Sequence, residues 1–365
     1  MKKKARLIAF YLPQYYPIPE NDNWHGKGFT EWTNVTKAKP LFKGHYQPIL
    51  PADLGFYDLR VSETRMAQAQ LAKEYGVEAF CYWHYWFGNG KRILDQPFHE
   101  VLKSKQPDFP FCLAWANASW TGIWYGMSNN TLLKQEYPGK EDYIAHFYAM
   151  LDAFKDERYL TVNGKRLFFI YSPHSIPNVN EFTTLWQDLA EKEGINSFYF
   201  IGATHLEEEP VYDGFMGSVQ LAPFECLNKK YPDKLERMFL RLSKKGITSM
   251  LKKSSQMPRK VHEYIELLEY LNNKKLKKNE LPLIMPNWDN TARSGLNGSV
   301  LTDSSPELFS EVIKNAIKKI DHIHNQDERI IFVQAWNEWA EGNYLEPDRK
   351  FGHGYLKAIK KNIFY

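Results

Sequence analysis

The sequence predicts a single α/β domain that folds as a (β/α)8 TIM barrel, and two patterns lead to this fold class. Eight short apolar runs recur along the 365 residues, and they are continuous rather than alternating. Continuous apolar runs are typical of parallel strands that are covered on both faces. Segments with helical periodicity lie between the runs, and strands that alternate with helices form a parallel sheet. Eight such units close into a barrel.

The predicted strands are these apolar runs, taken in chain order. They cover residues 7–12, 77–83, 111–116, 167–171, 198–203, 215–221, 283–286 and 330–335. Helical periodicity covers residues 62–75, 142–154, 181–193 and 306–325, with a shorter candidate at 95–102. Gly76 and Gly194 directly follow two of these segments, as helix-terminating glycines do. A doubly wound open sheet is the alternative, but no Gly-x-Gly-x-x-Gly motif follows a strand.

Two segments depart from a minimal barrel. Residues 13–51, after the first strand, are rich in Pro, Asn, Gly and aromatic residues and show no helical period. Loops of this length in compact domains are usually functional. In a barrel the loop after a strand lies over the carboxyl-terminal face, where active sites are built. We therefore expect this long first loop to cover the catalytic face.

The second departure is a basic segment at about residues 227–280. It holds 15 Lys and Arg against 6 Asp and Glu, a net charge of +9, in a chain whose net charge is +4. Its apolar positions predict two amphipathic helices, one around residues 235–242 and one over 261–271. A solvated helical insertion is one interpretation. An anionic partner, such as a membrane surface or a lipid-linked phosphate carrier, is the other.

Several other protein classes find no support in the sequence. No stretch approaches 18 apolar residues, so we expect no membrane span. The basic N-terminus precedes an apolar stretch too short for a signal peptide, and we expect a cytoplasmic protein. Cys81, Cys112 and Cys226 lack metal-type spacing, and neither a phosphate-binding loop nor an Asp-x-Asp tripeptide occurs. We therefore expect no metal, no cofactor, no disulfide and no nucleic-acid partner.

The most informative motif follows the last predicted strand. That strand runs directly into Trp336, Asn337, Glu338, Trp339 and Glu341. A carboxylate at the end of a buried strand is costly unless it is paired or used. Indole rings beside it are suited to stacking against a sugar. The motif predicts paired acids for glycosidic chemistry, and the alternative is a helix N-terminus that favours acidic residues.

Other strand ends carry aromatic or hydrogen-bonding residues, and in a barrel all of these ends meet at one face. Aromatic residues make up 15% of the chain, which is more than a core requires. His84 is equally well explained as a core histidine, and Glu31 as a residue that braces the loop. We also expect Asp289 and Arg293 to pair. The candidate substrate-binding residues are Tyr11, Gln14, Glu31, Trp32, His84, Trp86, Asn117, Trp120, Tyr171, His205, Trp288, Asp289, Trp336, Asn337 and Tyr344.

The motifs at residues 8–17, 26–35, 85–87, 108–117, 288–293 and 336–342 occur in an order that resembles the WbsX family. The resemblance spans almost the whole chain, apart from the basic segment. That family is similar to glycoside hydrolase family 99, the endo-α-mannosidases and endo-α-mannanases. Its members typically occur in bacterial gene clusters for O-antigen (lipopolysaccharide) and capsule synthesis, and they carry a glycosyltransferase label. The resemblance implies an oligo- or polysaccharide substrate.

The resemblance also implies roles for the acid pair. In family 99 the residue matching Glu338 deprotonates the sugar's own 2-hydroxyl, which attacks C1 to give a 1,2-anhydro sugar. The residue matching Glu341 acts as acid and then as base, with retention at C1. This route needs a 2-hydroxyl trans to the leaving group, as in α-mannosides and α-rhamnosides. Because Glu341 must hold a proton, we expect it to have the higher pKa of the two.

The chain departs from the family pattern in two places. Residues 115–126 lack a carboxylate, two arginines and an Asp that the family carries there, and His25 replaces a tryptophan. These changes leave Glu338 and Glu341 intact and bear on sugar preference. Three functions remain open: a hydrolase or transglycosidase, a glycosyltransferase of polysaccharide biosynthesis, and a barrel that binds glycans without turnover.

Overall fold

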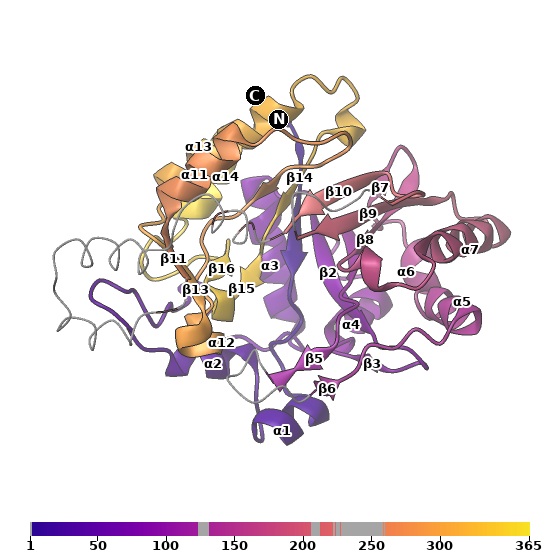
Figure 1. Cartoon of the computed structure of the whole chain (residues 1–365), viewed down its shortest axis with the longest axis horizontal. Coiled ribbons are helices and arrows are strands. Elements are labelled where there is room, and N and C mark those ends of the chain that lie inside the picture. The colour runs from indigo at the N-terminus through magenta and orange to yellow at the C-terminus, as the bar shows by residue number, and fades with distance from the viewer. Residues whose placement is uncertain are drawn as a thin grey trace, which may run out of the picture.

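The computed structural model describes residues 2–122, 131–205, 212–221, 223, 227, 258 and 260–365. Within these ranges, eight parallel strands form a nearly closed barrel, as the sequence predicts (Figure 1). Their spatial order is β10-β9-β8-β4-β2-β1-β14-β12. The bounds are β1 Arg6–Tyr11, β2 Ala79–Trp86, β4 Phe111–Trp115, β8 Lys165–Ile170, β9 Phe198–Thr204, β10 Gly217–Gln220, β12 Leu283–Ile284 and β14 Ile330–Val333.

The barrel closes between β10 and the segment that leads into β12. Ser218 on β10 forms an isolated parallel bridge with Glu280, and the backbone N–H of Leu281 donates a 2.8 Å hydrogen bond to the Ser218 carbonyl. Elsewhere the register is regular, with Ile8 opposite both Ala79 on β2 and Phe332 on β14. All eight carboxyl ends therefore point to one face of the molecule.

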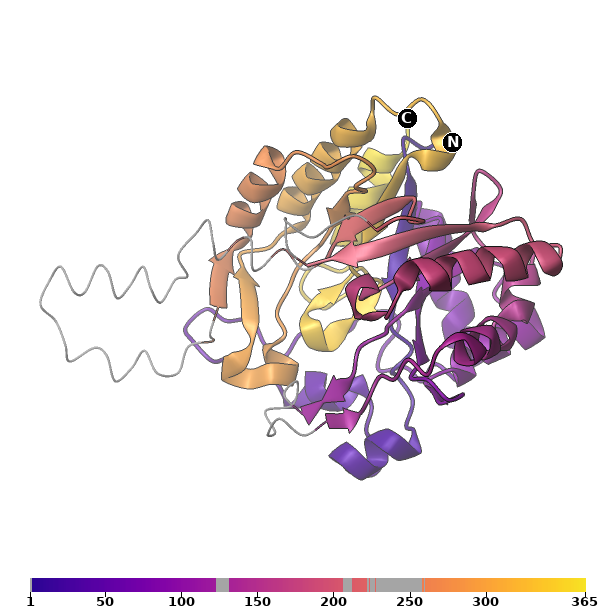
Figure 2. The same ribbon diagram turned by 45° about the vertical axis from the view of Figure 1, so that its right-hand side comes forward.

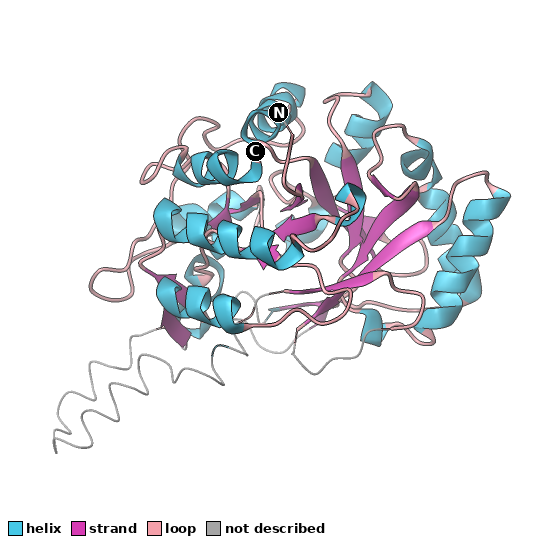
Figure 3. Ribbon diagram, turned by 90° about the horizontal axis from the view of Figure 1, so that it is seen from above, coloured by secondary structure: helices cyan, strands magenta, loops and turns pink. Residues whose placement is uncertain are grey.

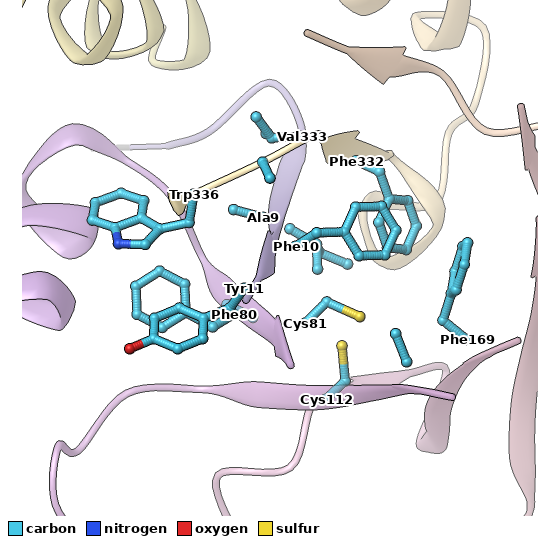
Figure 4. Packing of buried hydrophobic residues seen from close by; sticks show 14 of the residues in the cluster. Ala9, Phe10, Tyr11, Phe80, Cys81, Cys112, Phe169, Phe332, Val333 and Trp336 are labelled. Atoms are coloured by element: carbon cyan, nitrogen blue, oxygen red, sulfur yellow. The ribbon is translucent and has the colours of Figure 1, made fainter. Parts of the chain in front are cut away.

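Side chains fill the barrel interior. Phe10 packs against Phe169 and Phe332, with ring centroids 4.9 and 5.3 Å away. Cys81 and Cys112, opposite each other on β2 and β4, are free and fully buried in the same region (Figure 4). Since neighbouring residues of a strand point to opposite faces, Tyr11 and Phe80 lie on the other side of the sheet, under the helices.

Helices surround the strands as an outer layer (Figure 3). The predicted helix at 142–154 is divided at Met150 into two helices, and the last helix of the chain was not predicted. Gly76 ends α3 with φ of 92°, as expected of a helix-terminating glycine. The outer helices are α3 Ser62–Tyr75, α4 Gln96–Ser104, α5 Lys140–Ala149, α6 Leu151–Lys155, α7 Val179–Lys192, α11 Tyr264–Asn273, α13 Pro306–Ile320 and α14 Gly354–Ile363.

The long first loop lies at the carboxyl ends of the strands, as expected, but it is not without helix. It contains α1 (Pro19–His25) and α2 (Glu31–Lys37), each of seven residues. Two turns are too short for an apolar period to become visible in the sequence. Thr30 begins α2 with a capping box, and Glu31 and Trp32 on this helix are buried.

The predicted basic insertion is only partly within the described residues. Its second predicted helix begins instead as strand β11 (Lys260–Glu263), which pairs with β13 (Ser299–Thr302), and continues as α11. The first predicted helix lies outside the described residues. None of the helices in the described ranges is long and apolar enough to cross a membrane.

Short elements complete the two ends of the barrel. The two chain termini meet at the amino-terminal end, where Lys3 bridges Phe364 (Figure 2). The carboxyl-terminal face carries the first loop, the helix α12 (Thr291–Ser294) and the turn after β14. The remaining short strands are β3 Arg92–Ile93, β5 Trp120–Thr121, β6 Thr131–Leu133, β7 Thr161–Val162, β15 Asn337–Glu338 and β16 Asn343–Tyr344.

Candidate active site

The two candidate acids lie on a tight turn that follows β14. Glu338 ends β15, Glu341 ends the 3-10 helix Trp339–Glu341 (η5), and Asn343 pairs back against Glu338. Gly342 closes the turn with φ of 59°, and a Cβ there would lie 2.8 Å from the backbone nitrogen of Asp289. Only glycine satisfies both constraints. The local sequence thus folds both carboxylates onto one short hairpin.

Glu338 is almost completely buried and receives a hydrogen bond from a tryptophan. The indole Nε1 of Trp83 donates to Glu338 Oε1 at 2.9 Å. Burial, and then the negative charge of Glu341, raise the pKa of Glu338 well above its usual range, while Arg293 and Trp83 act in the opposite direction. Glu338 therefore favours its protonated form in the ligand-free protein.

Glu341 has a different environment, because it is ion-paired. Arg293 Nη1 on α12 donates a 2.6 Å hydrogen bond to Glu341 Oε1, and Arg293 Nη2 lies 3.0 Å from Glu31 Oε2. Glu31 belongs to α2, which packs against both α12 and η5. Burial raises the pKa of Glu338, because its direct partner is a neutral indole and the more distant Arg293 cation offsets burial only in part. The expectation that Glu341 has the higher pKa of the two stays a prediction.

Two rings beside the pair line the same end of the barrel. Trp83 stacks on Phe10 at 4.7 Å, and its ring centroid lies 5.9 Å from that of Tyr171. Burial, followed by the charges of Glu341 and Glu338, raises the pKa of Tyr171 to about 12. His205 follows closely, with Nε2 3.3 Å from the Tyr171 carbonyl oxygen. Tyr171 thus lies near the acids, and His205 contacts Tyr171.

Asp289 braces the first loop rather than pairing with Arg293. Its Oδ2 lies 2.7 Å from His45 Nε2 and accepts a 2.7 Å hydrogen bond from Gln47 Nε2, and its Oδ1 accepts from Thr291. The backbone N–H of Asp289 donates to the Glu341 carbonyl at 2.7 Å. The expected Asp289–Arg293 pair is therefore wrong, because each residue is held by other partners.

Three predicted contact residues point away from the barrel interior. Tyr11 donates a 2.7 Å hydrogen bond to Gln68 on α3, and His84 Nε2 lies 2.8 Å from His146 Nε2 on α5. Trp86 donates to Asp142, also on α5. The reason is alternation along the strands, since Phe10 and Trp83 occupy the inward positions next to them. Tyr11, His84 and Trp86 pack under helices, and the core interpretation of His84 is correct.

Other residues of the motif that follows the last strand pack against the turn on the side away from the acids. Trp336 is fully buried against Phe80, so it is a core residue and not a rim platform (Figure 4). The side chain of Asn337 bonds both backbone groups of Leu12, at 2.8 and 3.0 Å. Tyr344 stacks on Trp339 at 4.1 Å.

The remaining candidate residues either join neighbouring loops or belong to loops at the carboxyl-terminal face of the barrel. The Trp32 indole donates to the Tyr57 carbonyl at 2.8 Å, and Asn117 exchanges two 2.8 Å hydrogen bonds with the backbone of Ser172. Both residues join neighbouring loops. Gln14 is buried next to α2, where its backbone carbonyl accepts a 3.1 Å hydrogen bond from the backbone N–H of Glu31.

Two candidate tryptophans belong to loops of the carboxyl-terminal face. Trp120 is partly exposed on β5, where it contacts Tyr85 and Trp24. Trp288, largely buried, precedes Asp289 and accepts a 2.8 Å backbone hydrogen bond from Leu301.

Sequence reasoning missed Trp83 as a contact of the acid pair and misassigned Arg293. Alternation along β2 groups Cys81 with Trp83 and separates both from His84, but it does not say which group faces inward. Nothing in the sequence marks Arg293 as the partner of Glu31 and Glu341, which are 262 and 48 residues away along the chain. Among the described residues, no group of His, Cys, Asp and Glu has the arrangement of a metal site.

The fold and the buried carboxylates that follow its last strand define a TIM-barrel protein with a pair of acids at the carboxyl-terminal face. A family model described as glycosyltransferase WbsX matches residues 7–359. The chain belongs to the WbsX family.

Relatives and solved structures agree with this assignment. Two proteins described as uncharacterized protein WxcX, from Xanthomonas campestris pv. campestris strains B100 and ATCC 33913, are each 35% identical over 363 residues. The match covers 98% of this chain, which spans about half (50%) of the length of these relatives.

The solved structures show the fold. A chain described as a glycoside hydrolase-like protein superposes with a TM-score of 0.59 at 13% identity, over 100% of this chain and 95% of that one. The family 99 endo-α-mannosidase of Bacteroides thetaiotaomicron gives a TM-score of 0.55 at 17% identity, over 98% and 96% of the two chains. The predicted likeness to family 99 is confirmed at the level of the fold.

Proposed function

We propose that this protein is an enzyme that cleaves or transfers an α-mannoside-like glycosidic bond with retention at C1, with Glu338 and Glu341 as its acid–base pair. The observation that carries the proposal is the contrast between the two carboxyl groups. One is buried beside a neutral indole and has a raised pKa, whereas the other is ion-paired to Arg293. Carboxyl groups in contrasting environments divide into acid and base roles.

In the proposed first step, Glu338 removes the proton of the sugar's 2-hydroxyl. The freed oxygen bonds to C1 as the bond from C1 to the leaving oxygen breaks, and Glu341 gives its proton to that oxygen. In the second step, Glu341 takes a proton from water or from an acceptor hydroxyl, whose oxygen bonds to C1 and reopens the 1,2-anhydro ring. The 2-oxygen then recovers its proton from Glu338. Two inversions at C1 give net retention.

The assignment of the two roles follows the resemblance to family 99, and it requires the pair's proton to lie on Glu341 when the substrate is bound. In the ligand-free protein Glu338 favours the protonated form. We infer that the proton passes between the two neighbouring carboxyl groups as the 2-hydroxyl arrives at Glu338. Trp83 and Tyr171, beside the pair, are proposed to contact the sugar ring, and Trp120 and Trp288 to contact the glycan further out.

The proposal is tested by turnover of mannose-configured oligosaccharides and of surface polysaccharide from the source organism, with the product anomer followed by NMR. We expect retention, and we expect a substrate analogue that lacks the 2-hydroxyl to resist cleavage. Glu338→Gln and Glu341→Gln should each keep the fold and lose at least about a hundredfold in rate. A folded Glu341→Gln variant that turns over at the parent rate contradicts the assignment.

An aryl glycoside with an acidic leaving group separates the two roles, because its departure needs little help from an acid. On that substrate Glu341→Gln should retain the first step while Glu338→Gln should not. The opposite pattern reverses the two roles. Glycan binding by the parent protein without turnover of any of these substrates would identify a binding barrel instead of an enzyme.

Glycosyl transfer is the second candidate, because the family description names a glycosyltransferase. The same intermediate serves both reactions, and they differ only in the nucleophile of the second step. Addition of a mannose-configured acceptor should divert product from the free sugar to the transfer product if transfer is the function. An unchanged yield of free sugar favours hydrolysis. A lipid-linked phosphate carrier bound by the basic segment 227–280 would take part in the transfer reaction and not in hydrolysis.

A further inference from the structure

Behind the acid pair lies a buried carboxylate that the proposed reaction does not use. Glu346, five residues after Glu341, is 1% exposed. Its Oε1 accepts a 2.6 Å hydrogen bond from Gln68 Nε2 on α3, and its Oε2 accepts from the Tyr57 hydroxyl at 2.8 Å and from the Trp339 indole at 2.7 Å. A buried carboxylate is tolerated only where such donors replace water. Three segments of the chain supply them here.

Trp339 connects Glu346 to the acid pair. It directly follows Glu338 and stands two residues before Glu341, at the first position of η5. Besides the hydrogen bond to Glu346, its ring stacks on Tyr344, and its backbone N–H donates to the Tyr15 hydroxyl at 3.1 Å. The place of the turn that carries both acids thus depends on how this one side chain is held.

The other partners of Glu346 fix it to the body of the barrel. Gln68 accepts a hydrogen bond from Tyr11 on β1, so the carboxylate of Glu346 is linked through Gln68 on α3 to β1. The Tyr57 hydroxyl also accepts a 3.3 Å hydrogen bond from Asn337, whose amide is clamped to the backbone of Leu12. Glu346 therefore joins the end of β1, the segment before α3 that carries Tyr57, α3 itself and the turn that carries the acids.

We propose that Glu346 is a positioning residue that orders the Glu338–Glu341 turn through Trp339. Each partner supplies a donor, so only an acceptor with two oxygens satisfies Gln68, Tyr57 and Trp339 together. Positioning errors of about 1 Å are enough to reduce an enzymatic rate strongly. The kinetic part of this inference rests on the proposed function of the acid pair, whereas the ordering of the turn does not.

The test compares Glu346→Gln with the double exchange Gln68→Glu/Glu346→Gln. In Glu346→Gln, the new side-chain NH2 faces the NH2 of Gln68, so two donors lie opposite each other and the hydrogen bond is lost. In the double variant, the amide oxygen at 346 still accepts from Tyr57 and Trp339, while its NH2 donates to the new carboxylate at 68, which also accepts from Tyr11. The exchange thus restores every hydrogen bond with the charge moved to α3.

The matched control is Asp156→Asn at the opposite end of the barrel. Asp156 is also a buried carboxylate that accepts from several donors, including Lys105 and Arg158. Asp156 comes three residues before Tyr159, and Tyr159 forms a bridge with Phe111 at the start of β4. Its loss reproduces the general cost of removing a buried carboxylate and leaves the catalytic turn untouched.

The first measurement is amide hydrogen exchange of residues 336–342. We expect Glu346→Gln to accelerate it by about tenfold or more, the double exchange to return it to within about threefold of the parent, and the control to leave it unchanged. Unchanged exchange in Glu346→Gln overturns the proposal, whatever the activity. If Glu346→Gln does not fold, Trp339→Phe, which keeps an aromatic ring but removes the indole N–H donor, should produce the same local acceleration, and its absence overturns the proposal.

The second measurement is turnover of a glycan that the parent cleaves. We expect kcat of Glu346→Gln to fall by about tenfold or more with KM changed by less than about threefold, and the double exchange to recover it, since the acids are displaced and the sugar contacts are kept. Parent-like kcat with accelerated exchange overturns the kinetic part alone. A parent that turns over no glycan refutes the proposed function, and the exchange measurement still decides the role of Glu346.

Discussion

Arg293 joins Glu341 to Glu31, with 2.6 Å between Arg293 Nη1 and Glu341 Oε1 and 3.0 Å between Arg293 Nη2 and Glu31 Oε2. One guanidinium thereby connects α12, the first loop and the acid pair. Glu338, in contrast, accepts a 2.9 Å hydrogen bond from the neutral indole of Trp83. The two acids of the pair differ because only one of them has a cation as its direct partner.

Arg293→Met should move the pH dependence of the reaction. The Arg293 cation lowers the pKa of Glu338 against the larger effects of burial and of Glu341, so its removal should raise the pKa of Glu338 further. We expect the acid limb of the kcat/KM profile to move to higher pH by roughly one unit. The control is Arg60→Met, because Arg60 pairs with Asp58 on the surface. Identical profiles for parent and Arg293→Met would contradict the electrostatic role.

The contribution of Glu338 and Glu346 to stability should fall as pH rises from about 4.5 to 7. Burial raises the pKa of Glu346 to about 7, and burial with the charge of Glu341 raises that of Glu338. Below the unfolded pKa both states are protonated and there is no penalty. Above it the unfolded chain ionises first, so the native state loses relative stability until the folded pKa is passed.

Glu338→Gln removes part of that penalty. We expect it to melt above the parent by roughly 2 °C or more at pH 8 and to match the parent at pH 4.5, as scanning calorimetry can measure. A Tm difference that does not change with pH between these values would show that Glu338 titrates normally in the folded protein.

The two tryptophans Trp336 and Trp83 should respond differently to substitution. Trp336 is fully buried against Phe80, so Trp336→Ala should cost about 3–5 kcal/mol of unfolding free energy. Trp83→Phe keeps a ring beside Phe10 but removes the hydrogen bond to Glu338. It should leave Tm nearly unchanged and lower kcat by about tenfold or more. Denaturation curves and steady-state kinetics of both variants measure these effects. A Trp336→Ala variant as stable as the parent would show that Trp336 is not a core residue and lines the cleft instead.

The basic segment 227–280 should bind anionic vesicles if its charge recognises a membrane or a lipid-linked phosphate. Lys275, Lys277 and Lys278 are exposed, whereas Lys274 is partly buried and paired with Glu280. We expect sedimentation with anionic but not neutral liposomes, release by salt, and weaker binding after all three exposed lysines are replaced by Glu. Equal partitioning to both vesicle types, or to neither, supports the solvated insertion instead.

Local sequence determined the elements and their order. Eight continuous apolar runs became the eight barrel strands, because a strand buried on both faces needs apolar residues throughout its length. Gly76 and Gly342 stand where the backbone has positive φ, which side chains tolerate poorly. The short helices of the first loop escaped prediction because two turns carry too little periodicity, and their stability comes from burial against the barrel.

The position of Glu338 and Glu341 at the carboxyl-terminal face also followed from the sequence, since both residues come directly after the last strand. Tertiary structure alone decided which neighbours face them. Alternation separates Trp83 from His84, but the closed sheet determines which of the two points inward. The partners of Arg293 and Glu346 lie on segments that only the fold brings together, so no local pattern specifies an ion pair or a network that is assembled across the barrel.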